Sequence, residues 1–166
     1  YHDEFSYTLA TLAQAAFEQK EATLAGILSQ QAIAESNSAL QNEPNNVNFY
    51  KTRTRLFYAL SQTDPKYNAD TLDAIARAAI LAPTDPKIHY NLAILYGRAG
   101  QTETAIKTLE ETIKLKPDYR DPYYALALLL KDSGQKDEAK KNLEFILKNI
   151  NPQDPEVKQK LQEWAK

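Results

Sequence analysis

A 34-residue period in the second half of the chain is the strongest constraint on its fold. Similar residues return when the sequence from position 90 onward is shifted by 34 places. The matching pairs are Tyr90 and Tyr124, Leu92 and Leu126, Ala93 and Ala127, Gly100 and Gly134, Gln101 and Gln135, Ala105 and Ala139, and Leu109 and Leu143. A period of this length indicates stacked copies of one supersecondary unit, each burying its apolar face against its neighbours. We therefore expect a repeat array instead of a single closed core.

The segment 86–117 contains one complete period and predicts two amphipathic helices joined by a turn. Residues at helical spacing form one apolar face on each predicted helix, namely Leu92, Ala93 and Tyr96 on the first and Ala105, Leu109, Thr112 and Ile113 on the second. Gly100 lies where the first helix must end, since glycine adopts the left-handed conformation of a helix C-terminus without steric cost. Pro117 ends the second helix.

This pattern resembles the tetratricopeptide repeat, a 34-residue helix-turn-helix unit. The resemblance implies an all-α fold, a tetratricopeptide-like α-solenoid. It would be a right-handed superhelix of antiparallel helix pairs that ends in a C-terminal capping helix. We expect one domain over residues 1–166. Its parts are a degenerate repeat at 1–45, a second repeat with an insertion at 46–84, a third at 85–118, a fourth at 119–152 and the capping helix at 153–166.

Helical spacing also predicts helices outside the segment 86–117, at 3–19, 21–42, 48–61, 71–82, 136–150 and 155–165. The turn between the first two lacks the glycine of the later turns. Asp154 and Pro155 are typical of an N-cap and a first helical residue. Leu72, Ile75, Ala79 and Ile80 are predicted to face inward on the helix at 71–82.

The second repeat is irregular. Arg53 occupies a seam where an aliphatic residue is expected, so it either finds a polar partner or rotates into solvent, and we favour solvent. The surplus residues lie in Gln62–Asp70, which we interpret as a surface loop, although insertions in repeat proteins also occur near binding faces. This loop lacks the glycine and the closing glutamate of a calcium-binding motif.

Composition excludes several classes of function. The net charge of −2 gives no indication of a nucleic-acid-binding protein. Its distribution is uneven, because residues 1–48 contain one lysine against six acidic residues. The chain has no cysteine, so thiol catalysis, disulfides and cysteine metal sites are excluded. It has no methionine and begins at Tyr1, which suggests a fragment or a processed chain. No apolar run is long enough for a membrane span.

No catalytic, cofactor-binding or metal-binding constellation is present in the sequence. His2 lies near the end of the chain, and His89 occupies a position that usually packs between helices. There is no phosphate-binding glycine loop and no nucleophile elbow. We therefore expect a chain that is not itself an enzyme and needs no cofactor.

Tetratricopeptide domains commonly bind an extended peptide or a helix in a groove lined by the first helix of each repeat. Carried over by position, this resemblance implies a peptide-binding groove with contributions from three repeats. Its residues would be Lys51, Arg55 and Tyr58, then Lys87, Tyr90, Asn91, Ile94 and Arg98, and finally Asp121, Tyr124, Leu128 and Lys131. Tyrosines at equivalent points suit a binding face, but they equally suit packing between repeats. One subclass of these domains binds the C-terminal carboxylate of a peptide with basic side chains at set positions. The fourth repeat has Asp121 and Ala125 where that clamp needs lysine and arginine, so we do not expect it here.

Three strings carry a narrower resemblance, namely Asn48–Arg55 with Phe57–Ser61, Leu81–Pro86, and Tyr119–Leu126. They are similar to the C-terminal repeat tail of bacterial O-antigen polymerase/ligase-like membrane proteins. This resemblance implies a tether to a membrane domain that carries the chemistry, with this chain outside the bilayer on either its cytoplasmic or its extracytoplasmic side. The function expected first is a scaffold that binds a protein or peptide partner. The alternatives are an organising tail of such a membrane protein and a self-assembling repeat module.

Overall fold

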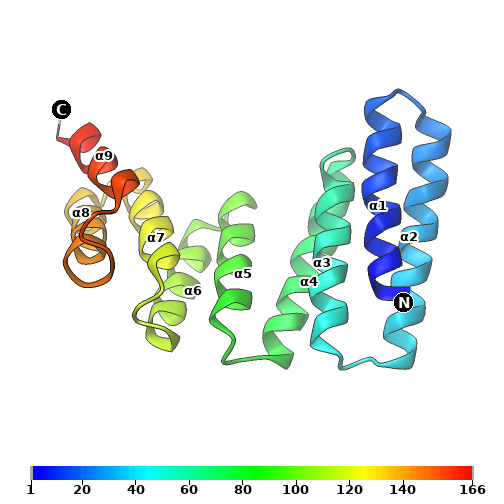
Figure 1. The fold of residues 1–166 in the computed structure, drawn as a ribbon, viewed down its shortest axis with the longest axis horizontal. Helices are drawn as coiled ribbons and strands as arrows, with labels where there is room; N and C mark the ends of the chain where they lie inside the picture. Colours follow the sequence, from blue (N-terminus) through cyan, green and yellow to red (C-terminus); the bar gives the residue numbers. More distant parts are fainter. Residues whose placement is uncertain (1, 166) are drawn as a thin grey trace. The chain divides into compact units, whose positions relative to one another are not determined.

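The computed structural model describes residues 2–165, so Tyr1 and Lys166, the ends of the predicted domain, lie outside the described residues. Within that range the chain forms only helices and the turns between them (Figure 1). The α-helices are α1 His2–Glu18, α2 Ala22–Asn42, α3 Val47–Ser61, α4 Asn68–Leu81, α5 Pro86–Arg98, α6 Thr102–Leu115, α7 Arg120–Asp132, α8 Lys136–Phe145 and α9 Pro155–Trp164. A 3-10 turn, η1, spans Pro65–Tyr67, and a π-helical turn, η2, spans Ile146–Ile150. The predicted all-α fold of helix pairs is confirmed.

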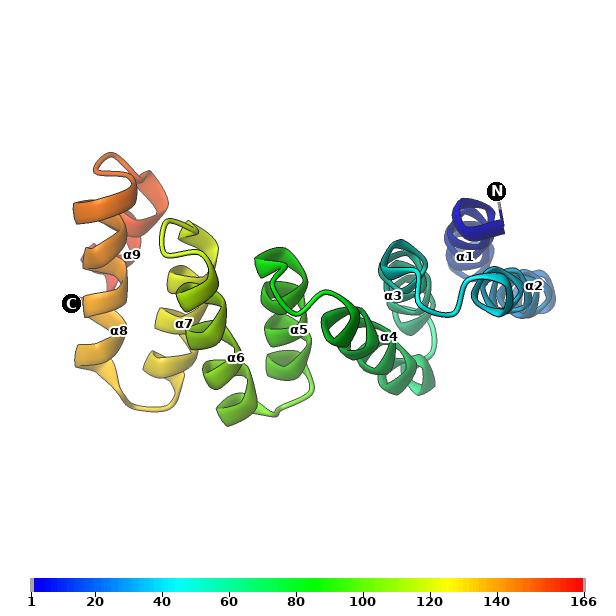
Figure 2. The same cartoon turned by 90° about the horizontal axis from the view of Figure 1, so that it is seen from below.

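The chain divides into two compact units, the first ending at Pro83 and the second beginning at Thr84. Helices α1 to α4 form the first unit and α5 to α9 form the second. In both units consecutive helices run antiparallel and pack as pairs, α1 with α2, α3 with α4, α5 with α6 and α7 with α8 (Figures 1 and 2). The predicted division into four repeats and a cap, and the superhelix, stay predictions.

Small side chains on α1 and α2 form much of the core of the first unit. Ala10, Ala13 and Ala32 are fully or almost fully buried and pack with Leu56 and Leu60 of α3. Alanine favours helix and lets helix backbones approach closely. A buried hydrogen bond from Thr52 Oγ1 to Asp3 Oδ2, at 2.8 Å, also joins α3 to α1.

The second unit is closed at its C-terminal end by α9. Val157 of α9 is fully buried in a cluster with Leu143 and Ile146, and Trp164 packs against the same cluster. The Asp154 carboxylate caps α9 by accepting from the Val157 amide at 3.0 Å, and Pro155 is the first residue of the helix. The predicted N-cap is therefore confirmed.

Three turns end the first helix of a pair with the same hydrogen bonds. Gly100 has φ +74°, the Gln101 amide donates to the Tyr96 carbonyl, and the Gly100 amide donates to that of Gly97, which is the Schellman arrangement. Gly134, at φ +84°, ends α7 in the same way. At the end of α1 the residue in this position is Lys20, with φ +65°. The first turn therefore keeps the geometry without the glycine.

Two features of the first unit differ from prediction. The segment interpreted as a loop contains η1, and α4 begins at Asn68, because Asp64 caps the turn by accepting from the Lys66 amide. Ile80 is 67% exposed instead of facing inward. The buried stripe of α4 ends at Ala78 and Ala79, and Ile80 lies about 100° farther around the helix.

Arg53 does not rotate into solvent as we favoured. Its guanidinium donates to Ser36 Oγ and Asn37 Oδ1 of α2, both at 2.9 Å, and lies 4.8 Å from the centre of the Phe57 ring. Burial lowers the pKa of Arg53. Neutral oxygen atoms of the neighbouring helix therefore accommodate this half-buried cation.

Candidate functional site

An open hollow of about 240 Å³ lies between α5 and α7 of the second unit. Almost all the groups that line it are apolar: Ala93, Ile94, Gly97, Arg98, Ala125, Leu128 and Leu129. Asp85 positions α5 by accepting from the Lys87 and Ile88 amides, and Gly100 ends it. Both ends of α5, which forms one side of the hollow, are therefore fixed by local hydrogen bonds.

Small residues create the hollow. Ala93 and Gly97 are one helical turn apart on α5, and Ala125 lies on the facing side of α7. A β-carbon placed on Gly97 would come within 3.7 Å of Leu129 and 3.9 Å of Ala105, which are ordinary contact distances. The site therefore tolerates a methyl group at position 97, and larger side chains there would occupy part of the hollow.

Three of the predicted groove residues, Ile94, Arg98 and Leu128, line this hollow. Two others, Lys87 and Asn91, are exposed on α5. Positions 87, 91, 94 and 98 recur at steps of three and four residues, so they share one face of that helix. Ile94 and Leu128 thus meet at one hollow, and the polar and cationic side chains lie along the same face of α5 as Ile94.

Both candidate tyrosines take part in packing inside the unit. The Tyr90 ring lies 5.5 Å from that of Tyr119, and burial raises the pKa of its phenol. The Tyr124 ring packs with the cluster under α9 and lies 4.4 Å from the guanidinium carbon of Arg120. Burial also raises the pKa of Tyr124. Replacing either ring would therefore disturb the fold as well as a binding face.

Arg120 holds α9 against α7 through several acceptors. Its Nε lies 3.0 Å from Asp154, and a terminal nitrogen lies 2.6 Å from Glu156. Asp121, a predicted groove residue, lies 3.3 Å from the same guanidinium. Lys131, another predicted groove residue, lies 4.7 Å from the centre of the Trp164 ring. These two groove residues therefore lie beside the contacts that hold the C-terminal helix.

The remaining predicted groove residues belong to α3 in the first unit. Lys51 and Arg55 are exposed, and Tyr58 is 36% exposed. Arg55 stacks on the Tyr7 ring of α1, with its guanidinium carbon 3.9 Å from the ring centre. Their spacing of four and three residues places all three on one face of α3.

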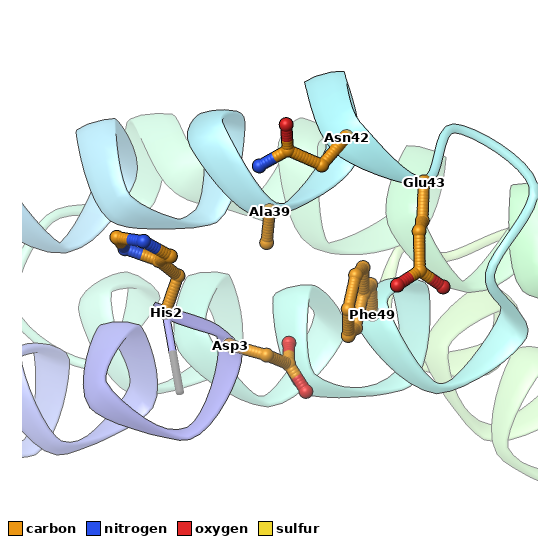
Figure 3. Close-up of a pocket in the computed structure, with 6 residues that line it drawn as sticks. All are labelled: His2, Asp3, Ala39, Asn42, Glu43 and Phe49. Carbon is orange, nitrogen blue, oxygen red and sulfur yellow. The ribbon is translucent and has the colours of Figure 1, made fainter.

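A second hollow, of about 200 Å³, lies among α1, α2 and α3. Its lining is mixed in polarity and includes His2, Asp3, Ala39, Asn42, Glu43 and Phe49 (Figure 3). Burial raises the pKa of Asp3, and its hydrogen bond from Thr52 partly offsets this effect. Figure 3 shows the Asp3 carboxylate directed toward Phe49 of α3. This carboxylate already accepts the hydrogen bond from Thr52 that joins α3 to α1.

The part of the chain that the structure describes has no cluster of three or more histidine or acidic side chains that could hold a metal ion. Among the same residues, no helix is both long enough and apolar enough to cross a bilayer.

Sequence reasoning missed Ala93, Gly97, Ala125 and Leu129 as lining residues. The one available signal was the pair of small residues at a four-residue step on α5, because small side chains leave room between packed helices. Which helix would face them depends on tertiary packing.

Known proteins share this arrangement of helix pairs. Two models described as tetratricopeptide repeat match residues 74–107 and 98–163. The fold resembles TTC0263, a thermophilic tetratricopeptide-repeat protein of Thermus thermophilus, with a TM-score of 0.66 and 19% identity over 95% of this chain and 79% of that one. It resembles MamA with a TM-score of 0.67 and 23% identity, over 82% and 77%. It also resembles PilF of Pseudomonas aeruginosa with a TM-score of 0.65 and 17% identity, over 99% and 69%.

No curated protein matches the chain. At these identities the solved structures establish the fold alone, whereas the repeat models establish the family. Proteins with tetratricopeptide repeats are generally non-catalytic scaffolds that bind other proteins. With its helix pairs, its glycine-ended turns and these matches, the chain belongs to the tetratricopeptide-repeat family.

Proposed function

We propose that the second unit binds a segment of a partner protein and inserts one large apolar side chain of that segment between α5 and α7. The observation that carries this proposal is the open, mainly apolar hollow between Ile94 and Leu128. Apolar surface that stays open to solvent is a common mark of a protein-binding site. Ile94 and Leu128 would supply the apolar contact area.

The size of the hollow favours a side chain over a small-molecule ligand. Ligand pockets usually enclose about 300–1,000 Å³ and bury most of the ligand. This hollow is smaller, at about 240 Å³, and it is open. A single anchor residue on a longer chain suits such a site, since the rest of the segment can lie along the exposed helix face.

Charge at the rim favours an acidic segment. Lys87 and Arg98 flank Ile94 on the same face of α5, and Lys131 lies one turn beyond Leu128 on α7. The acidic predicted groove residue, Asp121, lies beside Arg120. Rim charges contribute more to association rate and partner selection than to affinity. We therefore expect aspartate or glutamate next to the anchor residue.

The scaffold role and the absence of catalysis form part of this proposal. The organising tail of an O-antigen polymerase/ligase-like protein stays a prediction from sequence resemblance. The assignment of Lys51, Arg55 and Tyr58 to a peptide-binding groove also stays a prediction.

A peptide-display selection on the full chain tests the proposal. We expect selected peptides to share one large apolar residue flanked by acidic residues. Leu128→Asp should weaken their binding by at least about tenfold, measured by isothermal titration calorimetry. Leu115→Asp is the matched control, because Leu115 is an exposed leucine of the same unit, 41% exposed, that does not line the hollow. Equal affinity for the Leu128→Asp variant and the parent chain would contradict the proposed site.

A further inference from the structure

We propose that α1 and α2 carry a second, separate interaction surface, which binds an amphipathic helix rich in lysine or arginine. Four exposed side chains, Phe5, Leu12, Leu24 and Ile27, define this N-terminal apolar face. They are 36%, 50%, 43% and 58% exposed in that order. None of them lines the hollow between α5 and α7.

The N-terminal apolar face points away from α3. Asp3 contacts α3 through Thr52, and Leu12 lies nine residues farther along α1. Nine residues correspond to about two and a half helical turns, so Leu12 is on the opposite side of α1.

The same relation holds on α2. Ser36 contacts α3 through Arg53, and Ile27 lies nine residues before it. Ile27 is therefore on the side of α2 opposite to its contact with α3. Both helices thus turn apolar side chains outward on the face that α3 does not cover.

The four side chains lie on one side of the hairpin that α1 and α2 form. Helices α1 and α2 lie side by side and antiparallel (Figures 1 and 2), and their turn centres on Lys20. Leu12 precedes Lys20 by eight residues and Ile27 follows it by seven, so they lie at the same level of the hairpin. Phe5 is two turns from Leu12 and Leu24 is one turn from Ile27, which extends the surface in both directions.

Helix α9 offers a comparison within the same chain. Val157 of α9 is fully buried, while Glu156, Lys158 and Gln159 are exposed, so its outer side is polar. The N-terminal apolar face is instead apolar and exposed, and exposed apolar surface with a polar rim is a mark of a binding site.

Charge around the face selects the partner. Residues 1–48 contain six acidic residues and Lys20 as their one lysine. Glu4, Glu18 and Glu21 are exposed along the same hairpin. A second copy of this face, or an anionic bilayer, would meet charge of the same sign. A helix with an apolar stripe and flanking cations complements both the apolar centre and the acidic rim.

Two dye-labelled peptides of about 18 residues, or five helical turns, test the proposal on the full chain. Both place leucine at every third or fourth position; one carries lysine elsewhere and the other glutamate. Fluorescence anisotropy should give saturable binding of the lysine peptide, weakened as salt rises from about 0.05 to about 0.3 M. The glutamate peptide should bind at least about tenfold more weakly.

Leu12→Asp with Ile27→Asp separates apolar docking from simple charge attraction. The added negative charges would tighten binding if attraction alone were responsible, whereas we expect them to weaken it at least about tenfold. Ile80→Asp is the matched control, because Ile80 is 67% exposed on α4 of the same unit. Leu128→Asp should leave this binding unchanged and thereby separate it from the proposed groove.

Three outcomes would overturn the inference. The first is the absence of saturable binding by the lysine peptide. The second is binding that Leu12→Asp with Ile27→Asp leaves unchanged or tightens. The third is a concentration-dependent dimer in sedimentation velocity that Ile27→Asp abolishes and the lysine peptide does not displace, because a second copy would then occupy the face.

Discussion

Replacing Lys20 with glycine should stabilise the first unit. Lys20 is the non-glycine residue with positive φ among the described residues, and it occupies the position that Gly100 and Gly134 take in the later turns. Its amide donates to the Phe17 carbonyl, and the Glu21 amide donates to that of Ala16, both at 2.9 Å. Glycine keeps both hydrogen bonds and removes the β-carbon that disfavours this conformation.

The magnitude follows from two opposing effects. A residue with a β-carbon in the left-handed region costs about 1–2 kcal/mol. Glycine in turn loses more backbone entropy on folding, which costs roughly 0.5–1 kcal/mol. With each effect near the middle of its range, the net gain in the free energy of unfolding is roughly 0.5–1 kcal/mol. For a domain of the size of the first unit, this corresponds to a rise in Tm of roughly 2–8 °C.

Urea denaturation followed by circular dichroism measures this gain, and hydrogen exchange at the α1 and α2 amides locates it. Lys20→Ala is the matched control, because it removes the same charge and keeps the β-carbon, so it should give no gain. If Lys20→Gly is no more stable than Lys20→Ala, the left-handed strain is not relieved and the reasoning is wrong.

Three further predictions use the same denaturation assay. Gly100→Val should lower the free energy of unfolding by about 1 kcal/mol or more. A β-carbon at position 100 would meet nothing within 4 Å, so the cost comes from the left-handed backbone conformation. An unchanged urea midpoint would refute this prediction. Gly26→Ala, inside α2 and also without a neighbour, should raise the free energy by about 0.5–1 kcal/mol; a loss would contradict this. Burial raises the pKa of Asp154, but hydrogen bonds, chiefly from Arg120, outweigh it and hold the pKa below its usual value. The ionised Asp154 carboxylate therefore stabilises the fold at neutral pH, and this stabilisation is lost as pH falls below about 4. The free energy of unfolding of Asp154→Asn should fall less steeply in acid than that of the parent chain. Equal slopes for the two proteins would refute this.

The helix pairs of the second unit could be predicted because local signals and apolar period agree there. Gly100 and Gly134 mark the turns, and Asp154 marks the start of α9. At the first turn the expected glycine is missing, yet Lys20 adopts the same backbone conformation. Packing of α1 on α2 therefore overrides the local preference, which sequence alone does not reveal.

The details of the sites depend on which elements approach one another. Arg53 was expected in solvent. Its acceptors, Ser36 and Asn37, belong to α2, and the sequence alone does not show that they lie beside Arg53 of α3. The hollow depends on Gly97 and Ala125 facing each other across α5 and α7. Helical spacing predicts the face of its own helix on which Ile94 or Leu128 lies. It does not show that a space opens between the two helices.

Intermolecular nuclear Overhauser effects between a selected peptide and the labelled methyl groups of the full chain test the central claim most directly. The account predicts contacts from the apolar anchor of the peptide to the methyl groups of Ile94 and Leu128, and none to those of Leu115 and Ile80. Contacts to Leu115 or Ile80 without contacts to Ile94 and Leu128 would show that the hollow between α5 and α7 is not the binding site.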